Sequence, residues 1–210
     1  EVASLYGNCK LYDRDTLQSD VAQFLAAVDA ARSTGCRLIA LNMATPPGRV
    51  KREDELWVQT QGLQMIGKEV AKMGVRIAIH NHTPEMRDEA REFRYMMGHV
   101  DSNAIGVCLD VAWAEVAGVS PTDLIDEVHP RLFDLHLRNV AAGWFTQSVP
   151  EGTISYAQIL DLLNRYRYEG WLVVELSYDD RVDVTRSFEQ NILRSIWYLK
   201  GLAACSGDTS

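Results

Sequence analysis

Two histidines and two carboxylates in this sequence have the residue types and surroundings of a metal-binding set. His80 ends the apolar run VRIAIH, Asp110 ends IGVCLD, His136 lies inside LFDLHL, and Glu175 lies inside WLVVELS. Imidazole nitrogens and carboxylate oxygens together suit Mn²⁺, Co²⁺, Zn²⁺ or Fe²⁺. The pattern therefore predicts a bound divalent cation, for which we prefer Mn²⁺, held by His80, Asp110, His136 and Glu175.

Each of these residues alone also has a structural interpretation. Asp110 has the position of a helix N-cap, and His136 inside an apolar run is typical of a hydrogen-bonded core group. Glu175 is harder to explain in this way, because a carboxylate in a buried strand is costly unless it is paired or binds a cation. If the strand around His80 continues, His80 and His82 point to opposite faces, and His80 is the expected inward residue.

Five further residues are candidates for proton transfer or substrate contacts. Glu85 ends the stretch HNHTPE and is expected to be either a catalytic base or a solvated loop charge. Trp113 and Trp144 are expected to form flat apolar walls of a binding site, or to belong to the plain core. Arg138 suits a carboxylate or phosphate of the substrate, or an ion pair at the rim of the fold. His82 is expected to contact the substrate.

The segments that carry these residues alternate between strand and helix patterns. Short aliphatic runs predict strands at 2–6, 36–42, 75–81, 105–111, 132–139 and 171–177. Helical periodicity follows at 17–28 with Asp15 as N-cap and Gly35 as stop, at 56–73 before Gly74, from Ser120, from Ser155 with Gln158 to Tyr166, and at 184–199. Because each strand leads to a helical stretch, the strands are expected to be parallel, with right-handed crossovers.

The polar residues distinguish the two folds that share this alternation. They lie at or beyond the expected carboxyl ends of the strands, at Asn8, Asn42, His80, Asp110, His136 and Glu175. A barrel brings such ends together at one rim, whereas a dinucleotide-binding domain needs a GxGxxG turn that LYGNCKLYD lacks. We therefore predict an α/β fold, a parallel (β/α)8 TIM barrel forming one domain over 1–210 without its first one or two βα units. About 50–70 upstream residues would supply the missing units.

Composition narrows the partners and the compartment. The net charge of −8 over 210 residues disfavours nucleic acid, and no run of 18 apolar residues indicates a membrane span. No charged and then apolar leader opens the sequence, so we expect a cytoplasmic protein with free thiols at Cys9, Cys36, Cys108 and Cys205. Unpaired strand edges of an incomplete barrel need missing residues or a partner to cover them, which leaves a homo-oligomer open.

The chain resembles the xylose isomerase-like TIM barrels, the sugar phosphate isomerase/epimerase superfamily that also includes inosose dehydratases and endonuclease IV. The segments GVRIAIHNHTPE, IGVCLDVAWAEVAGVSP, RLFDLHLRN and VPEGTISYAQILDLLNRYRYEGWLVVEL are similar to that group's motifs. The resemblance implies that Asp110, His136 and Glu175 fall on three metal-ligand positions. His80 stands where the epimerases commonly have Glu, and Trp113 stands where they often have His.

The expected function follows from the ligand set and the resemblance together. We expect a divalent-metal-dependent isomerase or epimerase that acts on a sugar or keto-sugar derivative through an enediolate, with Glu175 and Glu85 transferring the proton. A dehydratase that eliminates water from the same enediolate is the enzymatic alternative. A sugar-binding relative without turnover is the other, because the replaced Glu puts a symmetric two-base epimerisation in doubt. An endonuclease is disfavoured, because five histidines with a net charge of −8 provide neither several zinc sites nor a basic DNA surface.

Overall fold

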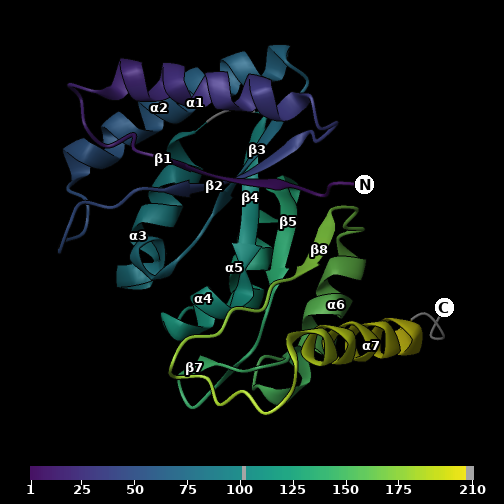
Figure 1. Cartoon of the computed structure of the whole chain (residues 1–210). Coiled ribbons are helices and arrows are strands. Elements are labelled where there is room, and N and C mark those ends of the chain that lie inside the picture. Colours follow the sequence, from purple (N-terminus) through teal and green to yellow (C-terminus); the bar gives the residue numbers. More distant parts are fainter. Residues whose placement is uncertain (101–102, 207–210) are drawn as a thin grey trace.

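Six parallel strands form one curved sheet in the computed structural model, which describes residues 1–100 and 103–206 (Figure 1). The strands lie in sequence order: β1 (Leu5–Cys9), β2 (Leu38–Met43), β3 (Arg76–His80), β4 (Ile105–Asp110), β5 (Leu132–Leu137) and β8 (Trp171–Val174). Every neighbouring pair is parallel. An order without reversal is the order of a barrel wall, because a doubly wound sheet reverses direction at a switch point.

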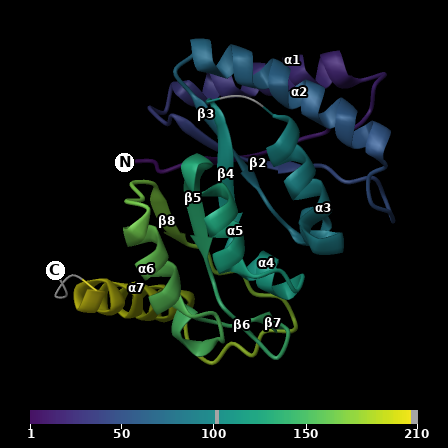
Figure 2. The same ribbon diagram turned by 180° about the vertical axis from the view of Figure 1, so that it is seen from behind.

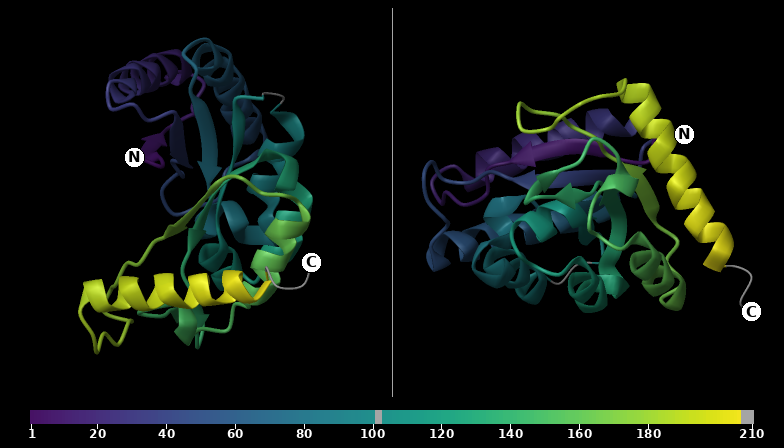
Figure 3. Two further views of the ribbon diagram at one scale, coloured as in Figure 1. Left: turned by 90° about the vertical axis from the view of Figure 1, so that its right-hand side faces the viewer. Right: turned by 90° about the horizontal axis from the view of Figure 1, so that it is seen from below.

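Helices cover the outer face of this curved sheet, except that the last helix runs across its lower end (Figures 2 and 3). They are α1 (Leu17–Arg32), α2 (Glu53–Lys72), α3 (Thr83–His99), α4 (Val111–Val116), α5 (Pro121–Val128), α6 (Tyr156–Arg165) and α7 (Phe188–Ser206). Each helix packs against the next one in the sequence. The predicted α/β fold of the TIM barrel type is confirmed, with six strands of the barrel wall present. None of the helices in 1–100 and 103–206 is long and apolar enough to cross a membrane.

Apolar side chains fill the space between the sheet and the helices. One cluster joins β1, β2 and β3 to α1 and α2, and a second joins β4 and β5 to α3 through α6. The inner face of the sheet carries a smaller group of buried side chains, namely Leu38, Ala40, Ala78 and Cys108. Small residues on this concave face leave room for the larger polar side chains at the strand ends.

Several predicted boundaries differ from the structure. The first strand spans 5–9 rather than 2–6, because its hydrogen bonds to β2 start where Leu5 pairs with Ile39. Asn8 therefore lies inside β1. The N-cap of α1 is Thr16 rather than Asp15, and the last helix begins at Phe188 rather than at 184. The caps of α5 and α6 are confirmed, because Ser120 and Ser155 each accept a hydrogen bond from the backbone of the third residue onward.

The connections at the carboxyl ends of the later strands are longer than those of the earlier ones. A two-stranded hairpin, β6 (Val140–Ala141) with β7 (Trp144–Phe145), follows β5, and a 3₁₀ turn (Val149–Glu151) leads on to α6. The segment 175–187 runs from β8 past this hairpin before α7 begins (Figure 1). These two connections place aromatic and charged side chains beside the ends of β4, β5 and β8. Gly35 and Gly74, predicted to end two helices, have positive φ angles of 84° and 67°.

Candidate metal and substrate site

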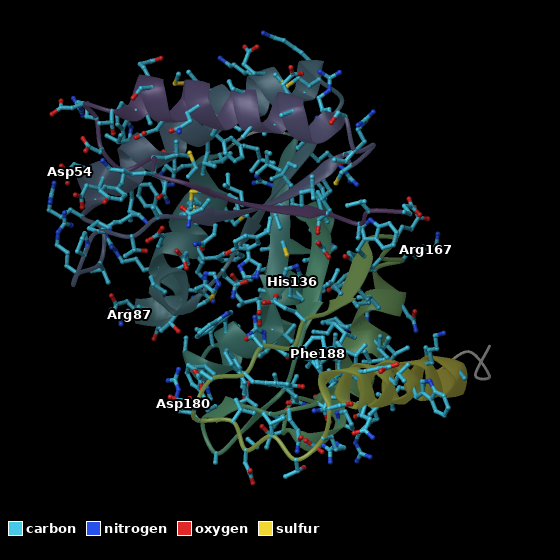
Figure 4. The ribbon with its side chains drawn as sticks, in the orientation of Figure 1. Asp54, Arg87, His136, Arg167, Asp180 and Phe188 are labelled. Atoms are coloured by element: carbon cyan, nitrogen blue, oxygen red, sulfur yellow. The ribbon has the colours of Figure 1, made fainter. Side chains whose placement is uncertain are left out.

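The four predicted ligands come together at the carboxyl-end rim of the sheet. His80 and Asp110 are the last residues of β3 and β4, His136 is in β5, and Glu175 follows β8 directly. Their ligand atoms lie within 4.8 Å of one another. Nδ1 of His136 is 3.1 Å from Nε2 of His80 and 2.5 Å from Oε2 of Glu175. Asp110 and His136 are in-register partners of β4 and β5, so their side chains lie at the same level along the strands. Figure 4 shows His136 near the centre of the molecule.

The two oxygens of the Asp110 carboxylate have different contacts, one with the start of a helix and one with the site. Oδ1 accepts hydrogen bonds from the backbone N–H groups of Ala112 and Trp113, so Asp110 is the N-cap of α4. Oδ2 faces the site, 3.9 Å from Nε2 of His80. Burial raises the pKa of Asp110 to about 6, against the opposing charge of Arg138. The capping and ligand interpretations are therefore compatible, since each uses a different oxygen.

The Arg138 guanidinium lies between two of the site's carboxylates. Its Nε is 3.0 Å from Oδ2 of Asp110, and its Nη2 pairs with Oε1 of Glu175. Nη1 donates to the Ser177 hydroxyl at 3.0 Å, and the guanidinium carbon lies 4.5 Å from the Phe145 ring centroid. Arg138 is 3% exposed. These are the contacts of the ion-pair interpretation, and the predicted substrate anion would have to compete with both carboxylates.

The two histidines of the site have opposite pKa shifts. Burial lowers the pKa of His80 well below its ordinary value, and the nearby His136 and His82 lower it further. Burial also opposes the charged form of His136, but the hydrogen bond and charge of Glu175 outweigh it and raise the pKa. For Glu175, burial is outweighed by the hydrogen bond from His136 and the charge of Arg138, so its pKa falls to about 2. A neutral His80 and an ionised Glu175 are the forms that bind metal ions.

His82 also reaches the rim, which the alternation of a continuing strand would not allow. Because β3 ends at His80, the backbone turns before His82, and the centroids of their two rings are 4.7 Å apart. Nδ1 of His82 is 2.8 Å from Oδ1 of Asn42, at the end of β2. The condition for placing His80 and His82 on opposite faces, a strand that continues past His80, is therefore not met, and both rings lie at the rim. Burial lowers the pKa of His82 to about 4, so its ring is neutral at pH 7.

Aromatic rings line one side of the rim. The centroid of the Trp113 ring lies 5.2 Å from that of His82, 4.7 Å from that of Phe145 and 5.7 Å from that of Trp144. The Arg181 guanidinium, from the segment 175–187, lies 3.3 Å from the Trp144 ring centroid. The indole nitrogen of Trp113 is buried and has no hydrogen-bond partner among the described residues. Trp113 therefore combines a flat apolar surface with an available donor, which suits the hydroxyl groups of a sugar ring.

Glu85 lies in the first turn of α3 rather than in a solvated loop. Its carboxylate accepts a hydrogen bond from the backbone N–H of His82 at 2.8 Å and completes a capping box. The residue is 1% exposed. Burial, with the nearby charge of Glu92, raises the pKa of Glu85 to about 7. The interpretation of Glu85 as a solvated charge is wrong, and its pKa is in the range that suits a group exchanging protons at neutral pH.

Tyr6 is a rim residue that the sequence did not single out. Its ring centroid lies 5.6 Å from that of His80. Partial burial raises the pKa of Tyr6 to about 12, and the charges of Glu175 and Glu85 contribute to this rise, although the residue is 56% exposed. An aromatic residue in a strand is typical of the core, so only the predicted strand's periodicity could have indicated that Tyr6 faces inward.

The observed donor set fits a divalent cation. Two imidazoles and two carboxylates from four strand ends provide a nitrogen and oxygen environment suited to Mn²⁺, Fe²⁺, Co²⁺ or Zn²⁺. Nε2 of His80 and Oδ2 of Asp110 face each other at 3.9 Å, which is too far for a hydrogen bond but close enough for both atoms to contact one ion.

Comparison with known proteins places this fold and rim in a family. The chain is 24% identical to an inosose dehydratase of Clostridium botulinum over 192 residues, which cover 76% of this chain and 64% of that relative's length. A sugar phosphate isomerase/epimerase structure from Parabacteroides distasonis matches 97% of this chain and 71% of its own, with a TM-score of 0.76 at 19% identity. The structure of D-psicose 3-epimerase from Clostridium cellulolyticum matches 92% of this chain and 74% of its own, with a TM-score of 0.74 at 15% identity. The sequence profile of the xylose isomerase-like TIM barrel matches residues 2–200. The chain belongs to the xylose isomerase-like TIM barrel family.

Proposed function

We propose that this protein is a divalent-metal-dependent isomerase or epimerase of a sugar or keto-sugar derivative. The observation that supports this most directly is the meeting of His80, Asp110, His136 and Glu175 within 4.8 Å at the carboxyl-end rim of a parallel barrel wall. Such rims are where enzymes of this architecture build their active sites. The activity of the whole protein is part of the proposal, because the chain spans 64% of the curated dehydratase it matches.

The ligand residues would hold the cation, with Mn²⁺ our preferred ion. When bound, the ion supplies a Lewis acid that makes a proton next to a carbonyl easier to remove. His80 is neutral and Glu175 is ionised, so both are ready to bind without first losing a proton. Arg138 pairs with both carboxylates and would fix the orientation of Glu175.

Proton transfer is assigned to Glu175 and Glu85. Glu175 is an ionised acceptor at the rim itself, and Glu85, with a pKa of about 7, exchanges protons near neutral pH. Tyr6, whose ring centroid lies 5.6 Å from that of His80, would orient a substrate hydroxyl at the rim. Trp113 and His82 would contact the ring of the substrate, with Trp144 as an outer wall.

A dehydratase is the second candidate, and the similarity to an inosose dehydratase favours it. Removal of the same proton, followed by departure of a hydroxide from the neighbouring carbon, gives elimination in place of epimerisation. The two reactions share every residue assigned above and differ only in the fate of the enediolate. Small carbohydrates are the proposed substrates in either case, and a location in the cytoplasm remains part of the proposal.

Solvent isotope exchange tests this function directly. Metal-stripped protein is reloaded with Mn²⁺ and incubated in D₂O with a panel of ketoses and keto-polyols, and products are analysed by mass spectrometry. We expect metal-dependent uptake of deuterium, or loss of water for a dehydratase, and neither in Glu175→Gln. The matched control is Asp126→Asn, which alters an exposed carboxylate that accepts a hydrogen bond from the Tyr166 hydroxyl. This variant is expected to behave as the wild type. Binding of a ketose without exchange or elimination would instead establish a sugar-binding relative.

A further inference from the structure

A second row of inward side chains lies one step below the rim. His80 pairs in register with Cys108 of β4, and Cys108 pairs with Asp134 of β5. Cys108 and Asp134 each precede a rim residue by two positions, so they share the inner face with Asp110 and His136. The row is buried, since Cys108 and Asp134 are both 0% exposed. A thiol and a carboxylate therefore lie directly beneath the proposed metal ligands.

The same two histidines serve both rows. His80, Cys108 and His136 offer ligand atoms within 4.8 Å of one another. Nδ1 of His136 faces Glu175 at 2.5 Å, whereas Nε2 lies 3.8 Å from Oδ2 of Asp134. The imidazole of His136 thus has one nitrogen directed at each row.

The Asp134 carboxylate completes the polar surroundings of the lower row. Its Oδ2 accepts a hydrogen bond from the Ser4 hydroxyl at 2.9 Å, and the carboxylate also has a side-chain hydrogen bond with Cys108. Asp134 therefore places negative charge directly beside the thiol, which favours a cation bound there.

We propose that His80, Cys108 and His136 form a second, sulfur-containing cation position, with Asp134 as the neighbouring counter-charge. A set of one thiolate and two imidazoles selects thiophilic divalent ions such as Zn²⁺ and Co²⁺, whereas Asp110 and Glu175 suit harder ions such as Mn²⁺. Because the histidines are shared, one ion would occupy either the upper or the lower position. This position does not depend on the proposed isomerase chemistry.

Binding at the lower position needs one proton transfer and no redox step. The S–H bond of Cys108 breaks, a sulfur–metal bond forms, and the proton leaves to solvent. In the metal-free protein, burial and the carboxylates of Asp134 and Asp110 raise the pKa of Cys108 well above its ordinary value. A bound cation supplies the positive charge that stabilises the thiolate.

X-ray absorption spectroscopy of the Zn²⁺-loaded protein tests the proposal. The wild type is expected to show a sulfur scatterer at about 2.3 Å from the zinc ion. Cys108→Ala should lose this scatterer while it retains Mn²⁺ binding through the carboxylates. Cys9→Ala, which removes another buried thiol on β1, is the matched control and should keep it. Co²⁺ gives a second readout, a thiolate-to-metal absorption band that should follow the same pattern.

The outcomes separate this proposal from the proposed function. Bound Zn²⁺ without a sulfur neighbour in the wild type, or a sulfur signal that persists in Cys108→Ala, would overturn the lower position. The wild-type spectrum decides this even if the Cys108 variant does not fold. A sulfur signal in a protein that neither binds Mn²⁺ nor exchanges substrate protons would support the lower position and reject the isomerase. Failure to take up Zn²⁺ would overturn it as well.

Discussion

Nε of Arg138 lies 3.0 Å from Oδ2 of Asp110, and neither side chain is more than 4% exposed. The guanidinium also pairs with Glu175, so one arginine provides positive charge to both carboxylates of the proposed ligand set. A divalent cation would act on the same two oxygen groups. Arg138 and the metal ion therefore have overlapping electrostatic roles, and the first prediction measures that overlap.

Replacing Arg138 should lower the free energy of unfolding of the metal-free protein and increase the stabilisation that Mn²⁺ gives. In Arg138→Gln, Asp110 stays buried without its ion pair, so the free energy of unfolding should fall by about 3–5 kcal/mol. Added Mn²⁺ should then stabilise the variant more than it stabilises the wild type. Urea unfolding with and without Mn²⁺ measures both effects, and equal Mn²⁺ stabilisation of the two proteins would contradict the overlap. Arg32→Gln, which breaks the exposed pair with Asp29 on α1, should cost less than about 1 kcal/mol.

Removing the charge of Asp110 should separate metal binding from folding. Asp110→Asn keeps an oxygen that can cap α4, so the helix should remain, while one anionic ligand is lost. Loss of an outer partner alone costs about 10- to 100-fold in metal affinity, and we expect at least about 100-fold here. Isothermal titration with Mn²⁺ measures the affinity, and circular dichroism checks the helix. An unchanged Mn²⁺ affinity would remove Asp110 from the ligand set.

Glu85 should make the protein less stable as the pH rises. Its folded pKa of about 7 lies above the ordinary value of 4.5, so the folded protein holds this proton more tightly than the unfolded chain. The free energy of unfolding should therefore fall between pH 4.5 and pH 7, by roughly 3 kcal/mol in total. Glu85→Gln stays neutral and can still accept the His82 N–H. The free energy of unfolding of the variant should therefore increase relative to that of the wild type as the pH rises through this window. Urea unfolding at a series of pH values measures the difference.

Glu55 provides a control of opposite sign. It completes the capping box of α2 and pairs with Arg49, and this hydrogen bond lowers its pKa to about 2. Its stabilising contribution is present above its ordinary pKa and is lost as the pH falls toward 2. Glu55→Gln should therefore be less stable than the wild type at neutral pH. If both glutamate variants shifted stability in the same direction at pH 7, the burial argument for Glu85 would fail.

The Lys51–Glu92 ion pair should hold α3 in place. The two groups are 2.6 Å apart with side chains 0% and 6% exposed, and Gln59 donates to the same oxygen at 3.0 Å. Lys51→Met leaves Glu92 buried and unpaired, so it should cost about 3–5 kcal/mol. Adding Glu92→Gln, which keeps an oxygen for Gln59, should restore part of this loss. Urea unfolding of the two single variants and the double variant gives the coupling energy.

The exposed pair of Lys72 with Glu69 on α2 is the matched control for this cycle. Its side chains are 68% and 44% exposed, and its nitrogen–oxygen distance is 2.7 Å. The same cycle there should give less than about 1 kcal/mol. A coupling as small at Lys51 as at Lys72 would show that burial adds nothing to the pair.

The rim was predictable from sequence because topology determines it. Parallel strands joined by helices must end at one edge, so Asp110, His136 and Glu175 could be brought together without knowing any contact. Glu85 was not predictable in the same way, because its burial depends on how α3 packs against α2, which local sequence pattern does not reveal. Tyr6 was missed because its residue type is as common in a core as in a site.

Boundaries and pairings were less predictable than the order of the elements. The first strand was predicted at 2–6 and lies at 5–9, because hydrogen bonding to β2, rather than local composition, decides where β1 starts. Of the four predicted free thiols, Cys9, Cys36 and Cys108 are confirmed, and Cys205 lies outside the residues whose side chains the structure describes. The contact of Arg138 with Asp110 could not be inferred from spacing, because it depends on the rotamer that the buried guanidinium adopts.

The ligand candidates all come from one continuous arc, β3, β4, β5 and β8, whereas β1 and β2 bring Tyr6 and Asn42 to the rim. In the proposed site, the residues that would hold the cation therefore leave the turns after β1 and β2 free of ligands. A variant library confined to those two turns would change the surroundings of Tyr6 and Asn42 and leave all four ligand candidates in place.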